Sequence, residues 1–168
     1  EEIQATRICE VTDDVHAFRF TGLDALPIAS INRGFSAPII LQQDQDNLTR
    51  AFLLANDTDP FNKWEAGRAL ARDVMIRMVT EDAAPDQAYL DALLAVARDD
   101  TLDPAFKALV FSLPSGDDIA QALFDGGVTP DPTKIYLTAQ TLSQSIAQAM
   151  QDTLPRIYAQ MQVDGPFS

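Results

Sequence analysis

The sequence contains one cysteine and one histidine, and this scarcity limits the chemistry that the chain can perform. A single cysteine, Cys9, excludes an internal disulfide framework and fits a reducing compartment, so we expect a cytoplasmic location. A hydrolytic zinc centre needs about three protein ligands, commonly with two histidines one helical turn apart. His16 is alone, among apolar neighbours, and Cys9 has no histidine beside it. We therefore predict no catalytic, metal-binding or cofactor-binding residue in this chain.

Basic residues are also few. The 168 residues include 12 lysines and arginines against 25 acidic residues, which gives a formal charge of -13. No run of lysine or arginine offers a surface for phosphates, so we expect neither a nucleic-acid partner nor anchoring to lipid headgroups. No apolar stretch approaches the roughly 20 residues that span a bilayer, so we expect no membrane partner. The balance of 46% apolar and 22% charged residues is that of an ordinary globular protein.

Two further patterns resemble ligand sites without matching them. Asp44, Asp46 and Asn47 resemble the start of a calcium loop, but the sixth position is Thr49 where an EF-hand requires glycine. We interpret these residues as helix caps. Gly126-Gly127 has neither the spacing nor the lysine of a phosphate-binding loop, and it is interpreted as a helix end.

The beginning of the chain has the composition of β-strands. The β-branched and aromatic content of residues 3–11 and 15–20 predicts a hairpin, and residues 39–41 predict a third strand. Three such strands bury too little surface to be stable alone. Either the helices that follow cover them, or they are the end of a small β-sandwich whose other strands lie upstream. In the second case an unpaired strand edge would let isolated copies of the chain pair with one another.

The apolar period becomes helical after Asp46. A first stripe is predicted on Leu48, Ala51, Phe52 and Ala55. Later helices are predicted at 59–78, 85–98, 103–113, 115–125 and from 131 onward, with a kink or restart at Pro155. Six or seven antiparallel helices joined by short loops predict a right- or mixed-handed bundle or a HEAT-like stack. The Asp-Pro helix starts lie at 59, 103 and 131, thus 44 and then 28 residues apart, and this spacing indicates no strict repeat.

The helix at 59–78 organises the prediction. Asp59 is a suitable N-cap and Pro60 suits the first helical position. A buried face is predicted for Trp64, Gly67, Leu70, Ala71, Val74 and Met78. Trp64 is the expected anchor of this face. Because a glycine inside a helix costs roughly 1 kcal/mol relative to alanine, we expect another element to pass close to Gly67.

Two segments of the sequence are similar to bacterial aminopeptidase N, a family of zinc metallopeptidases with a gluzincin-type catalytic domain. They are NRGFSAPIIL at 32–41 and LTRAFLLANDTDPFNKWEAGRALA at 48–71, and DPAFKALVFSLPS at 103–115 adds to the likeness. The residues that match the sequence motifs of the family are Pro27, Arg33, Phe35, Ser36, Ala37, Pro38, Phe61, Trp64, Glu65 and Ala66. We interpret them as a structural motif.

The resemblance implies a position in a larger enzyme. Residues 1–43 would be the incomplete end of a β-sandwich domain, and 44–168 the incomplete start of a C-terminal helical domain. The zinc motif of the family, His-Glu-x-x-His, does not occur in these 168 residues, so the zinc would belong to the parent enzyme. This segment would support and cover the active site, and its partners would be the catalytic and upstream β-sandwich parts of the same polypeptide, with peptides as the parent's substrates.

A second hypothesis keeps the chain complete. Here the helices form a scaffold that binds partner proteins on one helical face, with the strands as an accessory. The absence of an initiator methionine before Glu1, and an end at Asp164–Ser168 without a helix cap, favour a piece of a longer protein.

Overall fold

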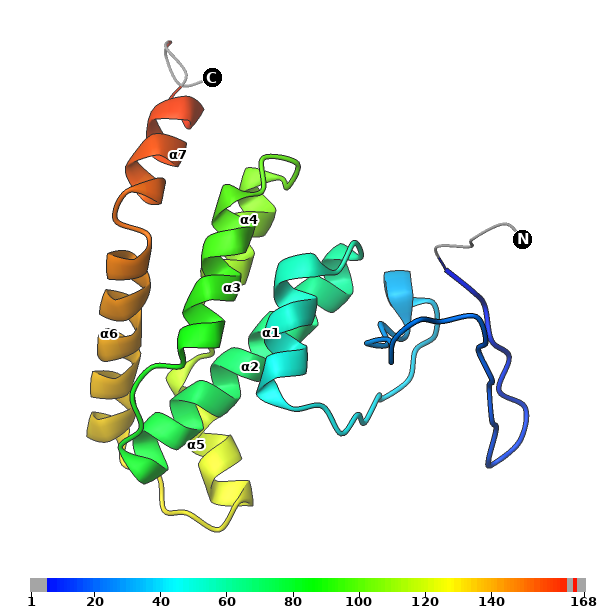
Figure 1. Cartoon of the computed structure of the whole chain (residues 1–168). Coiled ribbons are helices and arrows are strands. Elements are labelled where there is room, and N and C mark those ends of the chain that lie inside the picture. Colours follow the sequence, from blue (N-terminus) through cyan, green and yellow to red (C-terminus); the bar gives the residue numbers. More distant parts are fainter. Residues whose placement is uncertain (1–5, 163–164, 166–168) are drawn as a thin grey trace.

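The computed structural model describes residues 6–162 and 165, and these residues form an extended N-terminal segment followed by a helical stack (Figure 1). The N-terminal segment, residues 6–46, contains one short 3-10 helix, η1 (Arg33–Phe35). The helices are α1 (Asn47–Asn56), α2 (Pro60–Glu81), α3 (Gln87–Arg98), α4 (Pro104–Phe111), α5 (Gly116–Asp125), α6 (Pro132–Ala149) and α7 (Thr153–Met161). The prediction of six or seven helices is thus confirmed.

Most of the helices begin at an aspartate whose carboxylate accepts a hydrogen bond from the first turn. This satisfies a backbone N–H that the helix itself leaves without a partner. The predicted caps Asp59, Asp103 and Asp131 all act in this way, with N to O distances of 2.9, 2.8 and 2.9 Å. Ser115 and Asp118 form the predicted capping box. The aspartates at 46 and 86 are N-caps as well.

The helix ends also follow the sequence. Gly126 ends α5, and Gly127 has a φ of +76°, which glycine adopts without steric cost. Near the C-terminus, α6 stops at Ala149 and α7 restarts at Thr153, so Pro155 lies in the first turn of a new helix, where its missing N–H does no harm. The restart that was predicted at Pro155 therefore occurs a few residues earlier.

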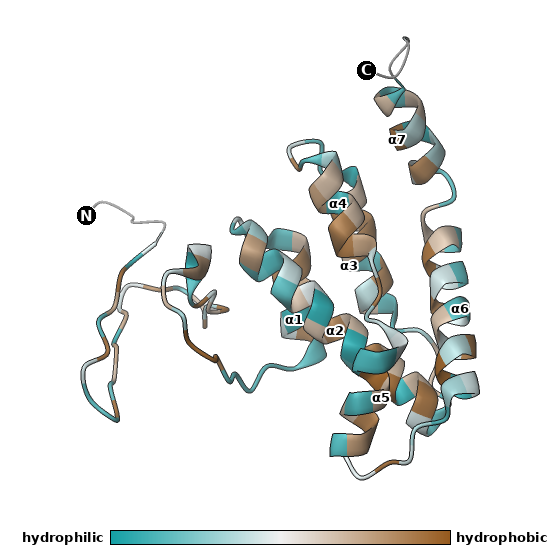
Figure 2. Cartoon of the chain, turned by 180° about the vertical axis from the view of Figure 1, so that it is seen from behind, coloured by the Kyte–Doolittle hydropathy of each residue, from teal (hydrophilic) through white to brown (hydrophobic). Residues whose placement is uncertain are grey.

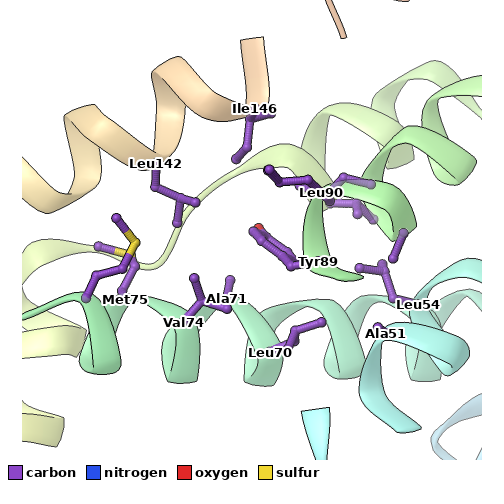
Figure 3. Close-up of a cluster of buried hydrophobic side chains, with 14 of the residues drawn as sticks. Ala51, Leu54, Leu70, Ala71, Val74, Met75, Tyr89, Leu90, Leu142 and Ile146 are labelled. Carbon is purple, nitrogen blue, oxygen red and sulfur yellow. The ribbon is translucent and has the colours of Figure 1, made fainter. Parts of the chain in front are cut away.

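The core lies around α2, which contacts α1, α3, α4, α5 and α6. Figure 3 shows apolar side chains of α1, α3 and α6 converging on this helix, with Tyr89 between α2 and α6. The largest fully buried side chains are Tyr89, Leu54, Leu70, Met75, Leu93, Ile119, Leu123, Leu142, Met150, Val74 and Val96. Five of the six residues predicted on the buried face of α2 are buried, all except Trp64. Seen from behind, the helices show hydrophilic and hydrophobic residues alternating along their length, as expected of helices that bury one face (Figure 2).

The close approach predicted at Gly67 is confirmed. A Cβ atom at this position would lie 2.9 Å from Cδ1 of Leu54 in α1. Leu54 is fully buried, so it has little room to move away. The glycine therefore allows α1 and α2 to pack closely.

Two predictions about burial were wrong. Trp64 is only partly buried and packs at the edge of the core, where Arg68 lies 5.6 Å from its ring centroid. Leu48 and Phe52 of the predicted α1 stripe are 71% and 50% exposed. Ala51 of that stripe is buried as predicted, together with Leu53 and Leu54, which were not predicted. The packing partners α2 and α3 lie against the face of α1 that carries Ala51 and Leu54. The spacing of apolar residues in the sequence cannot show which face of a helix its neighbours will cover.

The predicted strands do not form in residues 6–46. Residues 15–20 and 39–41, and the described part of 3–11, run as irregular chain, while residues 3–5 lie outside the described residues. A strand is held by backbone hydrogen bonds to a neighbouring strand, and here these segments have no backbone ladder between them. The β composition is present, but the described chain does not supply the pairing.

Candidate functional site

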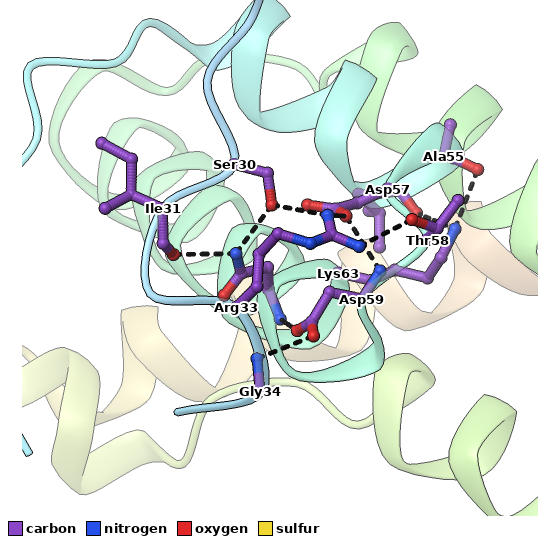
Figure 4. Close-up of polar contacts among 11 residues, drawn as sticks. Ser30, Ile31, Arg33, Gly34, Ala55, Asp57, Thr58, Asp59 and Lys63 are labelled. Atoms are coloured by element: carbon purple, nitrogen blue, oxygen red, sulfur yellow. Dashed lines mark hydrogen bonds and ion pairs between the residues drawn. The ribbon is translucent and has the colours of Figure 1, made fainter. Parts of the chain in front are cut away.

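The sequence motif converges on the contact between the N-terminal segment and the turn that joins α1 to α2. We call this contact the Arg33 joint and define it as Ser30, Ile31, Arg33, Gly34, Asp57, Thr58, Asp59 and Asn62. Residues about 25 positions apart in the sequence meet there (Figure 4). The motif therefore marks a point of attachment between two parts of the chain.

Arg33 supplies the central interactions of the joint. One guanidinium nitrogen, Nη1, donates to Oδ1 of Asp57 at 2.7 Å and to Oγ of Ser30 at 3.1 Å. The other, Nη2, donates to Oγ1 of Thr58 at 2.7 Å. The Asp57 side chain is 1% exposed and that of Arg33 is 24% exposed. Removal of one partner from so sheltered a charge pair strongly destabilises the folded state, because the other charge stays buried without compensation.

Asp59 links the start of α2 to the N-terminal segment. Its Oδ1 caps the helix by accepting from the Asn62 backbone N–H at 2.9 Å, and its Oδ2 accepts from the Gly34 N–H at 2.8 Å. Gly34 has a φ of +63°, a conformation that other residues reach only with strain. The Asn62 amide completes the link by donating to Oγ of Ser30 and to the carbonyl of Ile31, both at 2.8 Å.

Aromatic side chains of the motif meet beside these polar contacts. The rings of Phe35 and Phe61 are edge to face with centroids 5.3 Å apart, and Phe61 lies 6.1 Å from Trp64. Such pairs contribute about 0.5–1.5 kcal/mol beyond the area they bury. The predicted motif residues Phe35, Phe61 and Trp64 thus form one continuous row of aromatic rings.

The other motif residues shape the loop or face solvent, except Ala66, which is buried in α2. Asn32 has a φ of 59°, and its Oδ1 accepts from the Ala37 N–H at 2.9 Å and from the Ser36 hydroxyl at 3.3 Å. Pro38 follows this turn and is exposed, as is Glu65. Neither has a partner in the joint.

A cavity of about 460 Å³ lies between the N-terminal segment and helices α1 and α2. Polar and apolar groups contribute about equally to its walls. The apolar residues include Phe35, Ile39 and Phe61, and the charged residues that line it, among those the structure describes, are Arg50 and Glu65. Neither a nucleophile with an adjacent base nor a set of metal ligands lines the cavity. Its composition suits binding or packing, and it does not support catalysis.

Two buried lysines were missed by the sequence analysis. Lys63 is 3% exposed and donates to the carbonyls of Leu54 and Ala55, at 3.0 and 2.9 Å, at the end of α1. Lys107 is 5% exposed and donates to the carbonyl of Ala97, at 3.2 Å, near the end of α3. Each lysine follows an Asp-Pro start by three residues, so the 44-residue spacing does mark a repeated hairpin in α1–α2 and α3–α4. The shared signal Asp-Pro-x-x-Lys could have revealed it.

The charges around Lys63 extend from the joint to the second hairpin. Burial lowers the pKa of Lys63, while the nearby carboxylates of Asp99 and Asp57 raise it. Hydrogen bonds from Thr101 lower the pKa of Asp99, and Lys63 and Lys107 lower it further. Asp99 caps the end of α3.

The remaining candidate residues have local contacts. His16 is exposed and stacks on Phe18 with ring centroids 4.6 Å apart, and Cys9 is half-buried as a free thiol. Asp46 caps α1. Within residues 6–162, no three histidine, cysteine or carboxylate side chains are grouped to hold a metal ion. Over the same residues, no helix is both long and apolar enough to cross a membrane.

Known families match both parts of the chain. A family model described as "Domain of unknown function (DUF3458_C) ARM repeats" matches residues 47–168. A second, described as "Domain of unknown function (DUF3458) Ig-like fold", matches residues 1–44. The helical stack agrees with the first description.

Curated relatives give the same picture over nearly the whole chain. The chain is 38% identical over 152 residues to Aminopeptidase N of Caulobacter vibrioides, covering 89% of this chain and 17% of that protein. It is 28% identical over 156 residues to Aminopeptidase N of Escherichia coli, covering 90% of this chain and 18% of that protein. The chain therefore spans less than one fifth of the length of these relatives.

A solved structure shares the fold. It is titled "Crystal structure of Legionella pneumophila aminopeptidase A in complex with aspartic acid" and superposes with a TM-score of 0.68 at 20% identity, covering 89% of this chain and 17% of that one. At this identity the likeness concerns the fold alone.

Proposed function

This chain belongs to the DUF3458 family, in which an Ig-like segment precedes ARM repeats, and from that membership we propose that it is a noncatalytic segment of a zinc aminopeptidase. The parent enzyme would hydrolyse N-terminal residues from peptides. The single observation that carries this proposal is the 38% identity to Aminopeptidase N of Caulobacter vibrioides across 89% of the chain. We propose a cytoplasmic location for the parent.

The zinc of the parent would be held outside the part of the chain that the structure describes. Three or more clustered His, Cys, Asp or Glu side chains are needed for such a centre, and residues 6–162 contain no such cluster. The side chains present do not fit a zinc ion. We therefore propose that this segment contributes to the reaction without reacting groups of its own. It would provide a surface near the active site and hold neighbouring parts of the enzyme in position.

Support and cover of the active site are the proposed mechanical roles. The N-terminal segment leaves large apolar side chains exposed, including Ile8 at 91%, Leu26 at 97% and Ile40 at 94%. Side chains of this kind are normally buried, so their exposure favours cover by the upstream β-sandwich of the same polypeptide. The Arg33 joint would then fix the helical stack to that sandwich and hold the stack over the catalytic domain.

The size of the native protein tests the proposal. Antiserum to this segment is used to follow the antigen through a gel-filtration column, while zinc and hydrolysis of an alanyl anilide are measured in the same fractions. We expect an antigen several times longer than 168 residues that co-elutes with zinc-dependent hydrolysis. An antigen of about 168 residues that elutes apart from any peptidase activity would overturn the proposal in favour of the scaffold hypothesis.

The covering role has a separate test. Hydrogen exchange of the parent enzyme is compared with and without a bound aminopeptidase inhibitor that chelates zinc. If the stack covers the active site, the inhibitor slows exchange in helices of this segment as well as in the catalytic domain. Slower exchange in the catalytic domain alone would contradict cover while leaving membership of an aminopeptidase intact.

A further inference from the structure

We propose that the cavity between the N-terminal segment and helices α1 and α2 binds a free amino acid with an apolar side chain, in its zwitterionic form. Arg50 donates hydrogen bonds to the ligand carboxylate, Glu65 accepts them from the ligand ammonium group, and apolar side chains of the walls hold the ligand side chain. Removal of N-terminal residues from peptides releases ligands of this class, so a response to product rests on the proposed function. The binding itself does not, because it requires no peptidase activity.

The cavity has a suitable size and two rigid walls. Its volume of about 460 Å³ lies within the range of small-molecule sites in proteins. Residues between 29 and 45 form one wall, and α1 supplies Arg50 and Leu53. The wall from α2 is one helical face, made of Phe61, Asn62, Glu65, Ala66 and Ala69. Because both charged residues belong to regular helices, their positions are held more precisely than positions in a loop.

Arg50 is the cation of the site, and its guanidinium group is held in place with donors to spare. Nη1 donates to Oδ1 of Asn47 at 3.1 Å, and the Asn47 amide donates in turn to Asp73 of α2. Among the residues that the structure describes, no carboxylate forms an ion pair with Arg50. A guanidinium group has five N–H donors in a planar fork that matches a carboxylate. Arg50, which is half-buried, can therefore bind the carboxylate of a ligand in the cavity.

Glu65 is the anion of the site. It lines the cavity and is also exposed, so it lies where the cavity opens to solvent. Within residues 6–162, no lysine or arginine forms an ion pair with its carboxylate. A carboxylate in this position accepts hydrogen bonds from the ammonium group of a ligand that enters from solvent.

The two charges are spaced to suit an α-amino acid. Near the start of α1, Asn47 bonds to Asp73 of α2, and near its end Leu54 lies against Gly67. Arg50 lies between the α1 members of these two contacts, so it stands opposite the middle of α2. The acidic residue of the site lies roughly 7 Å nearer to the α1–α2 turn, at 1.5 Å per residue along the helix. A zwitterion that makes one hydrogen bond of about 2.8 Å at each end reaches across this distance.

The rest of the lining suits the other parts of an amino acid. Leu53 is buried, and the rings of Phe35 and Phe61 also line the cavity, which gives an apolar surface for a side chain. Gln43 and Gln45 are half-buried beside it, and their amides can both donate and accept hydrogen bonds. A few polar groups beside an apolar wall are typical of small-molecule sites. The lining therefore favours a ligand that is charged at one end and apolar at the other.

Binding of L-leucine to the full-length protein that contains this chain tests the proposal. A zinc-chelating aminopeptidase inhibitor is kept at saturation, so that the active site of a peptidase takes up no leucine. Isothermal titration calorimetry measures the dissociation constant, and hydrogen exchange locates the ligand. We expect leucine to bind and to slow amide exchange in residues 39–53 and 61–69. The same result in a protein that hydrolyses no peptide would overturn the proposed function and leave this inference intact.

Matched ligands and variants test each charge separately. Leucinamide lacks the carboxylate, and N-acetyl-leucine lacks the ammonium group. We expect Arg50→Gln to weaken leucine binding about tenfold and to leave leucinamide binding unchanged, because leucinamide never made the contact that the variant removes. Glu65→Gln is expected to weaken leucine binding in the same way and to leave N-acetyl-leucine binding unchanged. Because Glu65 is exposed, this second variant remains measurable if Arg50→Gln does not fold.

Control variants separate this site from a general effect of charge. Arg68→Gln and Glu81→Gln remove one charge of each sign from exposed positions of α2 outside the cavity, and both are expected to leave leucine binding unchanged. The proposal is overturned if the inhibited protein takes up no leucine at millimolar concentration. It is also overturned if Arg50→Gln and Glu65→Gln bind leucine as the wild type does, or if leucinamide and N-acetyl-leucine bind as tightly as leucine.

Discussion

The two parts of this molecule contain similar kinds of apolar residues and treat them in opposite ways. Helices α1–α6 bury most of theirs around α2, whereas the N-terminal segment leaves side chains such as Val15 and Leu26 86% and 97% exposed. A helix satisfies its backbone within itself and needs only one packed face. A strand needs a neighbour for every backbone group, so an isolated strand-like segment has little to hold it. The difference shows which part of the chain folds from its own contacts.

Truncation of a core side chain gives the largest expected contrast. Leu70 is fully buried against α2's neighbours, so Leu70→Ala should lower the free energy of unfolding by about 2–5 kcal/mol. Leu26→Ala removes the same atoms from a side chain that is 97% exposed and should change it by less than about 0.5 kcal/mol. Urea denaturation of the two variants measures both values. Equal losses would show that the N-terminal segment has a core of its own.

Gly67 tests how tightly the helical part is packed. The added methyl group of Gly67→Ala meets the buried Leu54 at 2.9 Å, so we expect a loss of about 1–3 kcal/mol from overpacking, despite the better helix propensity of alanine. Gly116→Ala is the matched control, since its Cβ would lie 3.9 Å from Ile135, an ordinary contact. Thermal unfolding distinguishes them. A stabilised Gly67→Ala variant would mean that α1 can move away from α2.

Alkaline pH probes the core through Tyr89. Burial raises the pKa of Tyr89 well above its ordinary value of 10.0. The folded state keeps its proton above pH 10 while the unfolded state loses it, so stability is intact below pH 10 and falls as the pH rises further. We expect a loss of about 1.4 kcal/mol per pH unit from this group. Denaturation of wild type and Tyr89→Phe between pH 9 and 11.5 should show this slope in the wild type only; parallel curves would contradict it.

Two of the three Asp-Pro caps allow a comparison of the boundary between the two parts of the chain with the interior of the stack. Asp131→Ala removes a cap and should cost about 1 kcal/mol of unfolding free energy. Asp59→Ala removes a cap and also the acceptor of the Gly34 N–H, so we expect a somewhat larger loss. Chemical denaturation compares them. An equal loss in both would show that the N-terminal segment adds no stability through Asp59.

The smallest effect is expected at the surface. Arg68 and Asp118 join α2 to α5 at 3.1 Å, but their side chains are 49% and 46% exposed. Water and salt screen such pairs, so Arg68→Gln should change the free energy of unfolding by less than about 0.5 kcal/mol. Denaturation at low and high salt measures this. A loss above 1 kcal/mol would indicate that the contact of Arg68 with Trp64 matters more than the ion pair.

Sequence reasoning succeeded where the signal was local. Asp59, Asp103 and Ser115 each interact with residues two or three positions ahead, and their roles follow from sequence alone. The meeting of Arg33 with Asp57 could not be predicted from spacing, because 24 residues and a helix separate them. The family resemblance gathered these residues into one motif without giving its geometry.

Burial was harder to predict than helix position. Leu48 and Phe52 have the spacing of a core stripe, yet no described neighbour covers that face of α1. Lys63 and Lys107 are charged and would be placed at the surface by composition, but helix carbonyls compensate for their burial. Composition could not decide whether residues 15–20 and 39–41 form strands either, because a strand forms only beside a partner strand.

The double use of Asp59 sets an order of events during synthesis on the ribosome. Gly34 leaves the ribosome 25 residues before Asp59, its hydrogen-bond partner. At about 5–20 residues per second, residues 30–34 wait a few seconds or less before that partner exists. The carboxylate becomes fixed only when the first turn of α2 has formed around it. The emerging N-terminal segment therefore stays undocked until the translation machinery has delivered the helix that follows it.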